Sequence, residues 1–153
     1  MRDHVDHEPP VDVREIPAGD TALAVPALRA LRPHLDPARL AGVIDEQLRP
    51  AGYRLVGVFE AGSGPAVAVA GFRSTYALVR GLHLVVDEMV TVPSSRGRGH
   101  ASALMGWLKA EGVRRGCTEL HLDSAVGPDR AAAHRLYLRH HLRISAHHFH
   151  CEL

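Results

Sequence analysis

The alternation of apolar and polar residues near the start of the chain predicts one strand followed by two helices. Residues 11–16, "VDVREI", alternate as a half-buried strand does, and Pro17 ends the run. Apolar residues then recur at helical spacing over about 21–34 and 37–49, and Asp36 is placed to cap the second of these helices. We therefore expect the domain to begin as strand, helix, helix.

Three runs rich in β-branched and other apolar residues follow, and they predict consecutive strands over 53–60, 66–78 and 82–92. Residues 61–65, "AGSGP", have the composition of a hairpin turn, and 79–81, "VRG", that of a tighter one. Short connections of this kind join antiparallel neighbours. We expect the N-terminal part of the sheet to be antiparallel.

The second half of the chain predicts a crossover from strand to helix to strand. Residues 99–115 form an amphipathic helix that ends at Gly116. Its apolar face consists of Ala101, Leu104, Met105 and Leu108. Residues 118–124, "TELHLDS", are the next strand, which should run parallel to 82–92 because a crossover helix precedes it.

The last elements expected are a helix over about 129–140, capped by Asp129, and a final strand over 143–153, "RISAHHFHCEL". The fold class is then α/β (α+β), with a mixed sheet of about six to seven strands and about four helices. We expect one domain over 11–153 and a flexible N-terminus over 1–10.

Composition narrows the class of protein further. The chain has 153 residues and a net charge of +1, so no overall field favours nucleic acid or an acidic membrane surface. No apolar run approaches the ~20 residues of a membrane span. Cys117 and Cys151 form neither a disulfide framework nor a CxxC metal motif, which is typical of the reducing cytoplasm. We expect a cytoplasmic protein with no nucleic-acid or membrane partner.

One stretch carries the main chemical signal: residues 90–105, "VTVPSSRGRGHASALM". It joins a predicted strand to the start of a predicted helix, where free backbone N–H groups and the helix dipole favour an anion. Gly97 and Gly99 let an anion approach the main chain, and Arg96 and Arg98 add positive charge. Residues 96–102, which we call the corner, therefore indicate a site for a phosphate-bearing ligand.

Two nucleotide-binding motifs fit the corner less well. A P-loop needs GxxxxGK[ST], and the corner contains no lysine. A dinucleotide fingerprint needs GxGxxG; Gly97 and Gly99 match it, but Ser102 stands at the third glycine. Asp123, at the end of the next strand, would be the ribose-binding acid of such a site. A nucleotide- or dinucleotide-binding enzyme stays open as an alternative.

The stretch resembles the acyl-CoA-binding signature of the GNAT superfamily of N-acyltransferases, whose pattern is Arg or Gln, two residues, Gly, one residue, then Gly or Ala. Arg96, Gly99 and Ala101 occupy those places, after a Val-x-Val-Pro similar to that of the family. Residues 133–137, "AHRLY", resemble the Ala-x-x-Phe/Leu-Tyr helix that follows the next strand in the family. The order of predicted elements agrees, so the resemblance covers nearly the whole chain.

The resemblance implies acetyl-CoA as co-substrate, with its pyrophosphate on backbone N–H groups of 98–102. The pantetheine arm would lie along 90–92, where the parallel strands splay, and a backbone N–H there would polarise the acyl carbonyl. Arg130 would add a phosphate contact. The full implied set is Val90, Thr91, Val92, Arg96, Gly97, Arg98, Gly99, His100, Ala101, Ser102 and Arg130.

The implied reaction is acetyl transfer to a primary amine in a ternary complex, which needs a base and a proton donor. A carboxylate near the thioester accepts the amine proton, directly or through water. Glu88 lies where some family members carry a glutamate, and Asp87 is the second candidate. Tyr137 falls where the family's tyrosine donates to the CoA sulfur. The acceptor is open: a small amine, an antibiotic or a protein lysine.

The C-terminal histidines resemble a metal cluster, but alternation along the expected strand divides them between its two faces. His147 and Cys151 would lie on one face, and His148, His150 and Glu152 on the other. We expect no metal site here, and histidines that line the acceptor side or a homodimer surface. A non-catalytic CoA-binding module is the second alternative to an acetyltransferase.

Overall fold

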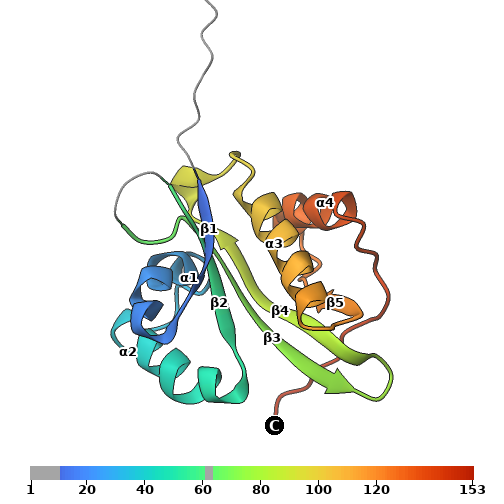
Figure 1. Ribbon diagram of the computed structural model, residues 1–153. Coiled ribbons are helices and arrows are strands. Elements are labelled where there is room, and N and C mark those ends of the chain that lie inside the picture. Colours follow the sequence, from blue (N-terminus) through green and yellow to red (C-terminus); the bar gives the residue numbers. More distant parts are fainter. Residues whose placement is uncertain (1–10, 61–63) are drawn as a thin grey trace, which may run out of the picture.

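The computed structural model describes residues 11–60 and 64–153. It has helices on both sides of a central sheet (Figure 1). The predictions of a flexible N-terminus over 1–10 and of a hairpin turn beginning at 61 fall on positions outside the described residues.

The sheet has five strands in the order β1-β2-β3-β4-β5. Neighbours from β1 to β4 are antiparallel, whereas β4 and β5 are parallel, as the sequence predicts. The bounds are β1 Asp12–Ile16, β2 Arg54–Phe59, β3 Ala68–Ala77, β4 Gly81–Thr91 and β5 Glu119–Leu122.

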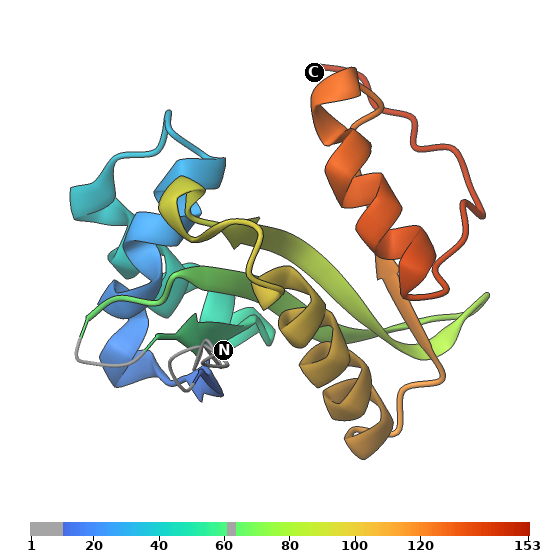
Figure 2. The same cartoon turned by 90° about the horizontal axis from the view of Figure 1, so that it is seen from above.

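Seen from above, α1 and α2 lie together on one side of the sheet and α3 on the other, and α4 is set apart from α3 (Figure 2). The α-helices are α1 Val25–Leu31, α2 Pro37–Val43, α3 His100–Arg114 and α4 Ala131–Arg139. Shorter helical turns are η1 Ala18–Ala24, η2 Ile44–Leu48, η3 Arg49–Ala51, η4 Pro93–Ser95 and η5 Pro128–Arg130. Asp36 caps α2 as predicted, because its Oδ1 accepts a hydrogen bond from the Ala38 N–H at 3.0 Å.

The first predicted helix is divided into the 3-10 turn η1 and the α-helix α1. Pro26 stands in the first turn of α1, where its missing N–H costs nothing and its fixed φ favours the start of a helix. An α-helix that continued through Pro26 from Thr21 would lose a backbone hydrogen bond there, so the α-helix starts afresh at Val25.

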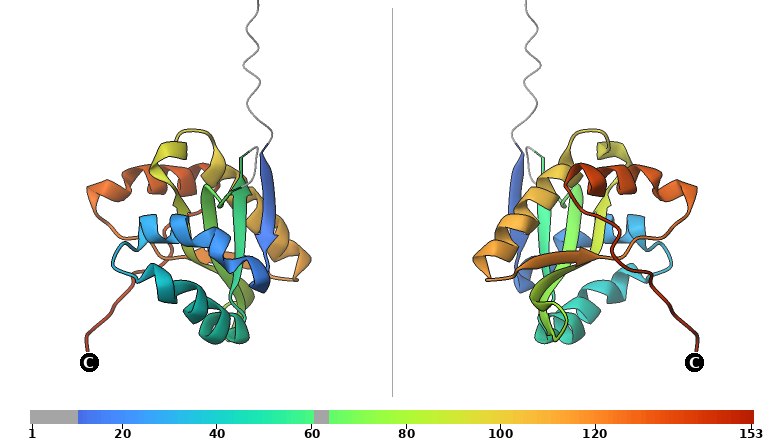
Figure 3. Two further views of the ribbon diagram at one scale, coloured as in Figure 1. Left: turned by 90° about the vertical axis from the view of Figure 1, so that its left-hand side faces the viewer. Right: turned by 90° about the vertical axis from the view of Figure 1, so that its right-hand side faces the viewer.

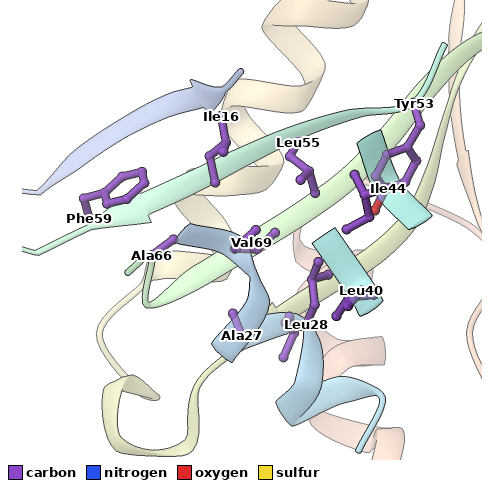
Figure 4. Packing of buried hydrophobic residues seen from close by; sticks show 12 residues of the cluster. Ile16, Ala27, Leu28, Leu40, Ile44, Tyr53, Leu55, Phe59, Ala66 and Val69 are labelled. Carbon is purple, nitrogen blue, oxygen red and sulfur yellow. The ribbon is translucent and has the colours of Figure 1, made fainter. Parts of the chain in front are cut away.

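Alternation along the strands divides the core into two clusters, one on each face of the sheet. Leu55 packs with α1 and α2 side chains in the cluster we call the α1/α2 core, part of which is drawn in Figure 4. The next residue, Val56, packs with Leu104 and Leu108 of α3 in the α3 core. Each face thus buries every second side chain, which fixes the register of β2.

β4 changes faces at a β-bulge. Phe72 pairs with Val86, but Gly71 pairs with Glu88, so Asp87 is an extra residue in β4. Val86 lies in the α3 core, whereas Glu88, opposite Gly71, faces the α1/α2 side. Without the extra residue, Glu88 would share a face with Val86 because strand side chains alternate with period two.

Two predictions about the C-terminal part are wrong. Residues 143–153 form no strand, so the described sheet has five strands rather than about six to seven. His141 ends α4 with a positive φ of 64°, and the chain then passes β5 and leaves the body of the molecule (Figure 3). An extended segment that pairs with no neighbouring strand has no ladder of backbone hydrogen bonds to make it a strand.

Asp129 does not cap α4. Pro128 begins the 3-10 turn η5, Asp129 lies inside that turn, and Arg130 is the residue before α4. Because proline is favoured at the first position of a helical turn, the turn starts one residue earlier than Asp129.

Candidate active site

The parallel strands β4 and β5 pair only over His83–Val86 and Glu119–Leu122. Beyond Val86, β4 continues to Thr91 without β5 beside it. A cavity of about 290 Å³ lies at this opening, which we call the splay cavity. It is lined by Leu31, Arg32, Val86, Asp87, Glu88, Met89, Leu122, Asp123, Ser124, Ala125, Asp129, Arg130 and Tyr137. The structure therefore brings the three predicted catalytic residues together.

Glu88 accepts a hydrogen bond from a buried tyrosine, Tyr53. The Tyr53 hydroxyl donates to Glu88 Oε2 at 2.6 Å. Burial raises the pKa of Glu88, and the hydrogen bond from Tyr53 opposes that rise. Burial and the neighbouring carboxylate raise the pKa of Tyr53, so its hydroxyl keeps its proton as a donor.

Gly71 makes room for this pair. A Cβ at Gly71 would stand 1.9 Å from Tyr53 Oη and 2.5 Å from Glu88 Oε2. Tyr53 directly precedes β2, and Gly71 and Glu88 lie on the next two strands, β3 and β4. Only a residue without a side chain lets the tyrosine and the carboxylate meet above the middle strand.

Asp87 also lines the splay cavity, but its hydrogen-bond partner differs from that of Glu88. Arg73 of β3 donates to its two carboxylate oxygens at 2.9 and 3.3 Å. Both carboxylate oxygens of Asp87 are therefore occupied by the arginine and are not free to contact an amine. The geometry therefore favours Glu88 over Asp87 as a base.

Tyr137 stands on α4, on the opposite wall of the splay cavity from α1. Burial raises the pKa of its phenol, and the charge and hydrogen bond of Arg130 oppose the rise. A phenol in this state is protonated at neutral pH and is available as a donor. Arg130 lies beside Tyr137 in this cavity.

The corner has the geometry of an anion site. Gly97 and Gly99 have positive φ values of 77° and 80°, which side-chain-bearing residues rarely adopt. Gly99 is the N-cap of α3 and has no side chain to make a capping hydrogen bond to the first turn of the helix. The N–H groups in the first turn of α3 have no intrahelical partners; they include those of Ala101 and Ser102. They point out of the N-terminal end of the helix, where an anion can accept hydrogen bonds from them.

The side chains of Arg98 and His100 face an acid that the sequence analysis does not identify. Glu60 Oε1 accepts a hydrogen bond from Arg98 Nη1 at 2.6 Å and lies 2.9 Å from His100 Nε2. These two bonds, from His100 and then from Arg98, lower the pKa of Glu60. The side chains of His100 and Arg98 are thus held by Glu60 and stabilise the corner. An anion at the corner would contact the backbone N–H groups beside them.

The other predicted ligand-binding residues lie within the corner or in residues 90–92, which precede it. Ser102 Oγ lies 2.5 Å from His140 Nε2, which ties the start of α3 to the end of α4. Arg96 Nε donates to the Thr91 carbonyl at 3.4 Å. The Val92 N–H is already donated to the Val67 carbonyl at 2.8 Å, so it is removed from the possible acyl-carbonyl donors. Val90 is buried in the α1/α2 core.

Three contributing residues are missed by sequence reasoning: Tyr53, Gly71 and Glu60. Tyr53 begins a strand and reads as core, and Glu60 ends one and reads as surface. Gly71 carries the only available signal, since a glycine inside a strand points to a bulge or a close approach. Even so, the signal does not say which side chains approach.

The C-terminal histidines do not gather. In the parts of the chain that the structure describes, no group of three or more His, Cys, Asp or Glu side chains could hold a metal ion. His148 Nδ1 lies 3.2 Å from Asp123 Oδ2, an exposed pair at the end of β5. Asp123, the acid required by the dinucleotide alternative, thus lines the splay cavity and faces a histidine.

Residues 21–142 match the sequence model of the acetyltransferase (GNAT) family. The chain belongs to this family. It has no match among curated protein sequences. Membership confirms the family resemblance carried by Arg96, Gly99 and Ala101, and with it an acyltransferase ancestry for the domain.

Solved structures of several acetyltransferases share the fold. A Trypanosoma brucei acetyltransferase is 23% identical, with a TM-score of 0.76 over 94% of this chain and 100% of the other. An aminoglycoside N-acetyltransferase solved in complex with CoA is 16% identical, with a TM-score of 0.81 over 97% and 98%. A ribosomal-protein-alanine N-acetyltransferase from Brucella melitensis is 19% identical, with a TM-score of 0.76 over 94% and 100%. At these identities the similarity establishes the fold alone, and the two acceptors that are named, an aminoglycoside and a ribosomal-protein alanine, differ from each other.

None of the helices in the described residues combines the length and apolar character needed to cross a membrane.

Proposed function

We propose that the protein is an N-acetyltransferase that moves acetyl from acetyl-CoA to a primary amine by direct attack. The observation that carries the proposal is the splay cavity, where Glu88 and Tyr137 line one space beside the unpaired part of β4. The corner, with its two positive-φ glycines and a helix N-terminus, fits the pyrophosphate of CoA.

The backbone of residues 98–102 would hold the pyrophosphate, and residues 90–92 would lie along the pantetheine arm. With the Val92 N–H donated to Val67, the acyl carbonyl takes its hydrogen bond from another N–H of this stretch. Arg130 lies beside Tyr137, so we assign it to orienting that phenol as well as to attracting the phosphates.

The reaction needs two proton transfers, and the chain supplies a residue for each. A neutral amine attacks the acyl carbon, the N–C bond forms, and Glu88 accepts the proton that the nitrogen loses, directly or through one water. The C–S bond breaks, and Tyr137 donates its proton to the departing sulfur. Solvent then reprotonates Tyr137 and removes the proton from Glu88.

The pKa of Glu88 suits this role. Burial raises it above that of an ordinary glutamate, which makes the carboxylate a stronger base, and the hydrogen bond from Tyr53 limits the rise. Activity should therefore increase with pH through the pKa of Glu88, with a further increase as the acceptor amine loses its proton.

The test is release of CoA thiol from acetyl-CoA with a panel of primary amines, together with the variants Glu88→Gln and Tyr137→Phe. We expect kcat/KM to fall about 100-fold or more for the first variant and about tenfold for the second. CoA binding, measured by calorimetry, should change little in either variant.

The alternatives give different results in the same experiment. A non-catalytic CoA-binding module would bind CoA and release no thiol with any amine. A nucleotide- or dinucleotide-binding enzyme would bind NAD in preference to CoA and lose that binding in Asp123→Asn. Either outcome contradicts the proposed activity.

We also infer a cytoplasmic homodimer. Cys117 and Cys151 are both free, in keeping with a reducing compartment. Residues 143–153, which we call the arm, are exposed along their whole length, Ile144 and Phe149 at 89% and 88%. The arm lies next to β5, an outer strand of the sheet. We therefore propose that the arm pairs with the β5 edge of a second copy of the chain.

A further inference from the structure

A second cavity, of about 310 Å³, opens on the α1/α2 side of the sheet. We call it the aliphatic cavity, because most of its wall consists of branched apolar side chains from α1, α2, η2 and the turn between the helices. They are Leu28, Leu35, Leu40, Val43, Ile44 and Leu48. A space of this size and character is suited to a small apolar group.

The aliphatic cavity ends at the proposed base. Tyr53 and Glu88 both line it, and in Figure 4 the Tyr53 ring points from β2 toward Leu40 and Ile44. Glu88 and Arg32 also line the splay cavity. The same carboxylate is thus reached from the CoA side and from the aliphatic side.

Apart from Glu88, the lining of the aliphatic cavity has more positive than negative side chains. Its charged lining residues besides Glu88 are Arg32, Asp36 and Arg39, and all three are exposed. Two arginines against one aspartate give no field that attracts a second cation. A ligand with several ammonium groups would leave them beside aliphatic side chains or arginines, where the loss of hydration is not repaid.

We propose that the aliphatic cavity binds the body of the acceptor, and that the acceptor is a primary amine on an apolar chain or ring with no second positive charge. The inference rests on the proposed acetyl transfer and names its substrate class. The apolar body displaces water from the wall, which gives about 0.8 kcal/mol for each buried CH₂. Its amine then lies at Glu88, next to the splay cavity.

Hexylamine and 1,6-diaminohexane, which differ in one terminal ammonium, test the proposal directly. We expect kcat/KM for hexylamine to exceed that for the diamine by about 30-fold or more. In Val43→Phe, which fills the cavity, KM for hexylamine should rise about tenfold with KM for acetyl-CoA unchanged.

Val113→Phe is the matched control, because Val113 is exposed on α3, outside the lining of either cavity. Leu48→Asp is a second cavity variant at a half-exposed position, in case Val43→Phe fails to fold. It places a negative charge in the wall and should move the preference toward the diamine.

Equal use of both amines, or equal effects of Val43→Phe and Val113→Phe on hexylamine, overturns the inference while acetyl transfer stands. If no amine is acetylated, the proposed function fails. Calorimetry with hexylamine alone then tests whether the aliphatic cavity binds the amine. Binding that is lost in Val43→Phe then supports the site, and no binding overturns it.

Discussion

At the scale of single residues, the pKa of Glu88 is under two opposing influences. Burial raises it, and the hydrogen bond from the Tyr53 hydroxyl lowers it. Tyr53 contacts Glu88 and not the reacting atoms of the proposed reaction, so we regard it as a positioning residue. Its contribution is to hold one carboxylate oxygen and to limit the rise in the pKa of Glu88.

Tyr53→Phe should therefore shift the acidic limb of the pH profile of kcat/KM to higher pH, because the opposing hydrogen bond is lost. At pH 7 we expect kcat/KM to fall about tenfold, the value of one hydrogen bond to a charged group. Tyr76→Phe, at an exposed position on β3, is the control. A fall of the same size at every pH, with no shift of the limb, would contradict the role given to Tyr53.

Gly71→Ala should disturb the same pair by steric contact. Its Cβ would lie 1.9 Å from Tyr53 Oη, so the ring must move and the hydrogen bond to Glu88 must lengthen. We expect a loss of about 1–3 kcal/mol in the free energy of unfolding and a lower kcat. Gly42→Ala in α2, where a Cβ meets nothing within 4 Å, should be neutral or stabilising in urea denaturation.

The sequence indicates Glu88 and Tyr137 but not Tyr53. Glu88 and Tyr137 are indicated by the family resemblance, which places Glu88 on the strand before the corner and Tyr137 at the end of "AHRLY". Tyr53 is 35 residues from Glu88, and nothing local distinguishes it from any buried tyrosine at the start of a strand. A contact that forms only when three strands pair cannot be predicted without their register.

At the scale of elements, α3 has a different function at each end. Its start forms the corner, and its end is fixed to the sheet through Glu111. Arg114 Nη2 and Arg115 Nε donate to Glu111 Oε1 at 2.5 and 2.8 Å. Arg115 Nη1 also donates to Ser74 Oγ of β3 at 3.0 Å. This network anchors the helix, and the position of the corner depends on it.

Glu111→Gln should lower the free energy of unfolding at pH 7. The hydrogen bonds of Arg114 and Arg115 hold the pKa of Glu111 at about 2, below its unfolded value. The stabilisation is present above the unfolded pKa and is lost as pH falls through the folded pKa. Because Arg114 is 71% exposed and screened by solvent, we expect a loss of about 2 kcal/mol.

Urea denaturation at pH 7 and pH 3 checks this prediction. The gap between wild type and Glu111→Gln should narrow at pH 3, because Glu111 of the unfolded wild-type chain is protonated there while the folded carboxylate is still largely ionised. Glu119→Gln, which removes the charge of an exposed carboxylate beside the partly buried His121, should cost less than about 0.5 kcal/mol. An equal gap at both pH values would mean that packing rather than charge is lost.

Most elements follow from periodicity, and the failures have physical causes. Five strands and the start of α3 lie within two residues of their predicted bounds, since each carries a clear period of two or of 3.6. The arm has the composition of a strand, but a strand needs a neighbour. Composition does not say whether that neighbour belongs to the same chain.

At the scale of the whole molecule, removing the arm tests the proposed homodimer. The full chain should elute as a dimer in light-scattering chromatography, and a chain ending at Leu142 as a monomer. The melting temperature of the isolated monomer should change little, because the arm buries little of its own surface and its His148–Asp123 pair is exposed. A truncated chain that stays dimeric contradicts this role for the arm.

The extra residue at Asp87 also affects how relatives of this chain are compared. Upstream of the bulge, even-numbered residues of β4 face α3, and downstream they face α1 and α2. Counting positions along β4 from one end therefore assigns the wrong face at the other. An alignment with a strand that lacks the bulge requires a one-residue gap at Asp87. Without that gap, Glu88 is matched to a side chain on the opposite face of the sheet, and a true equivalent of the proposed base is overlooked.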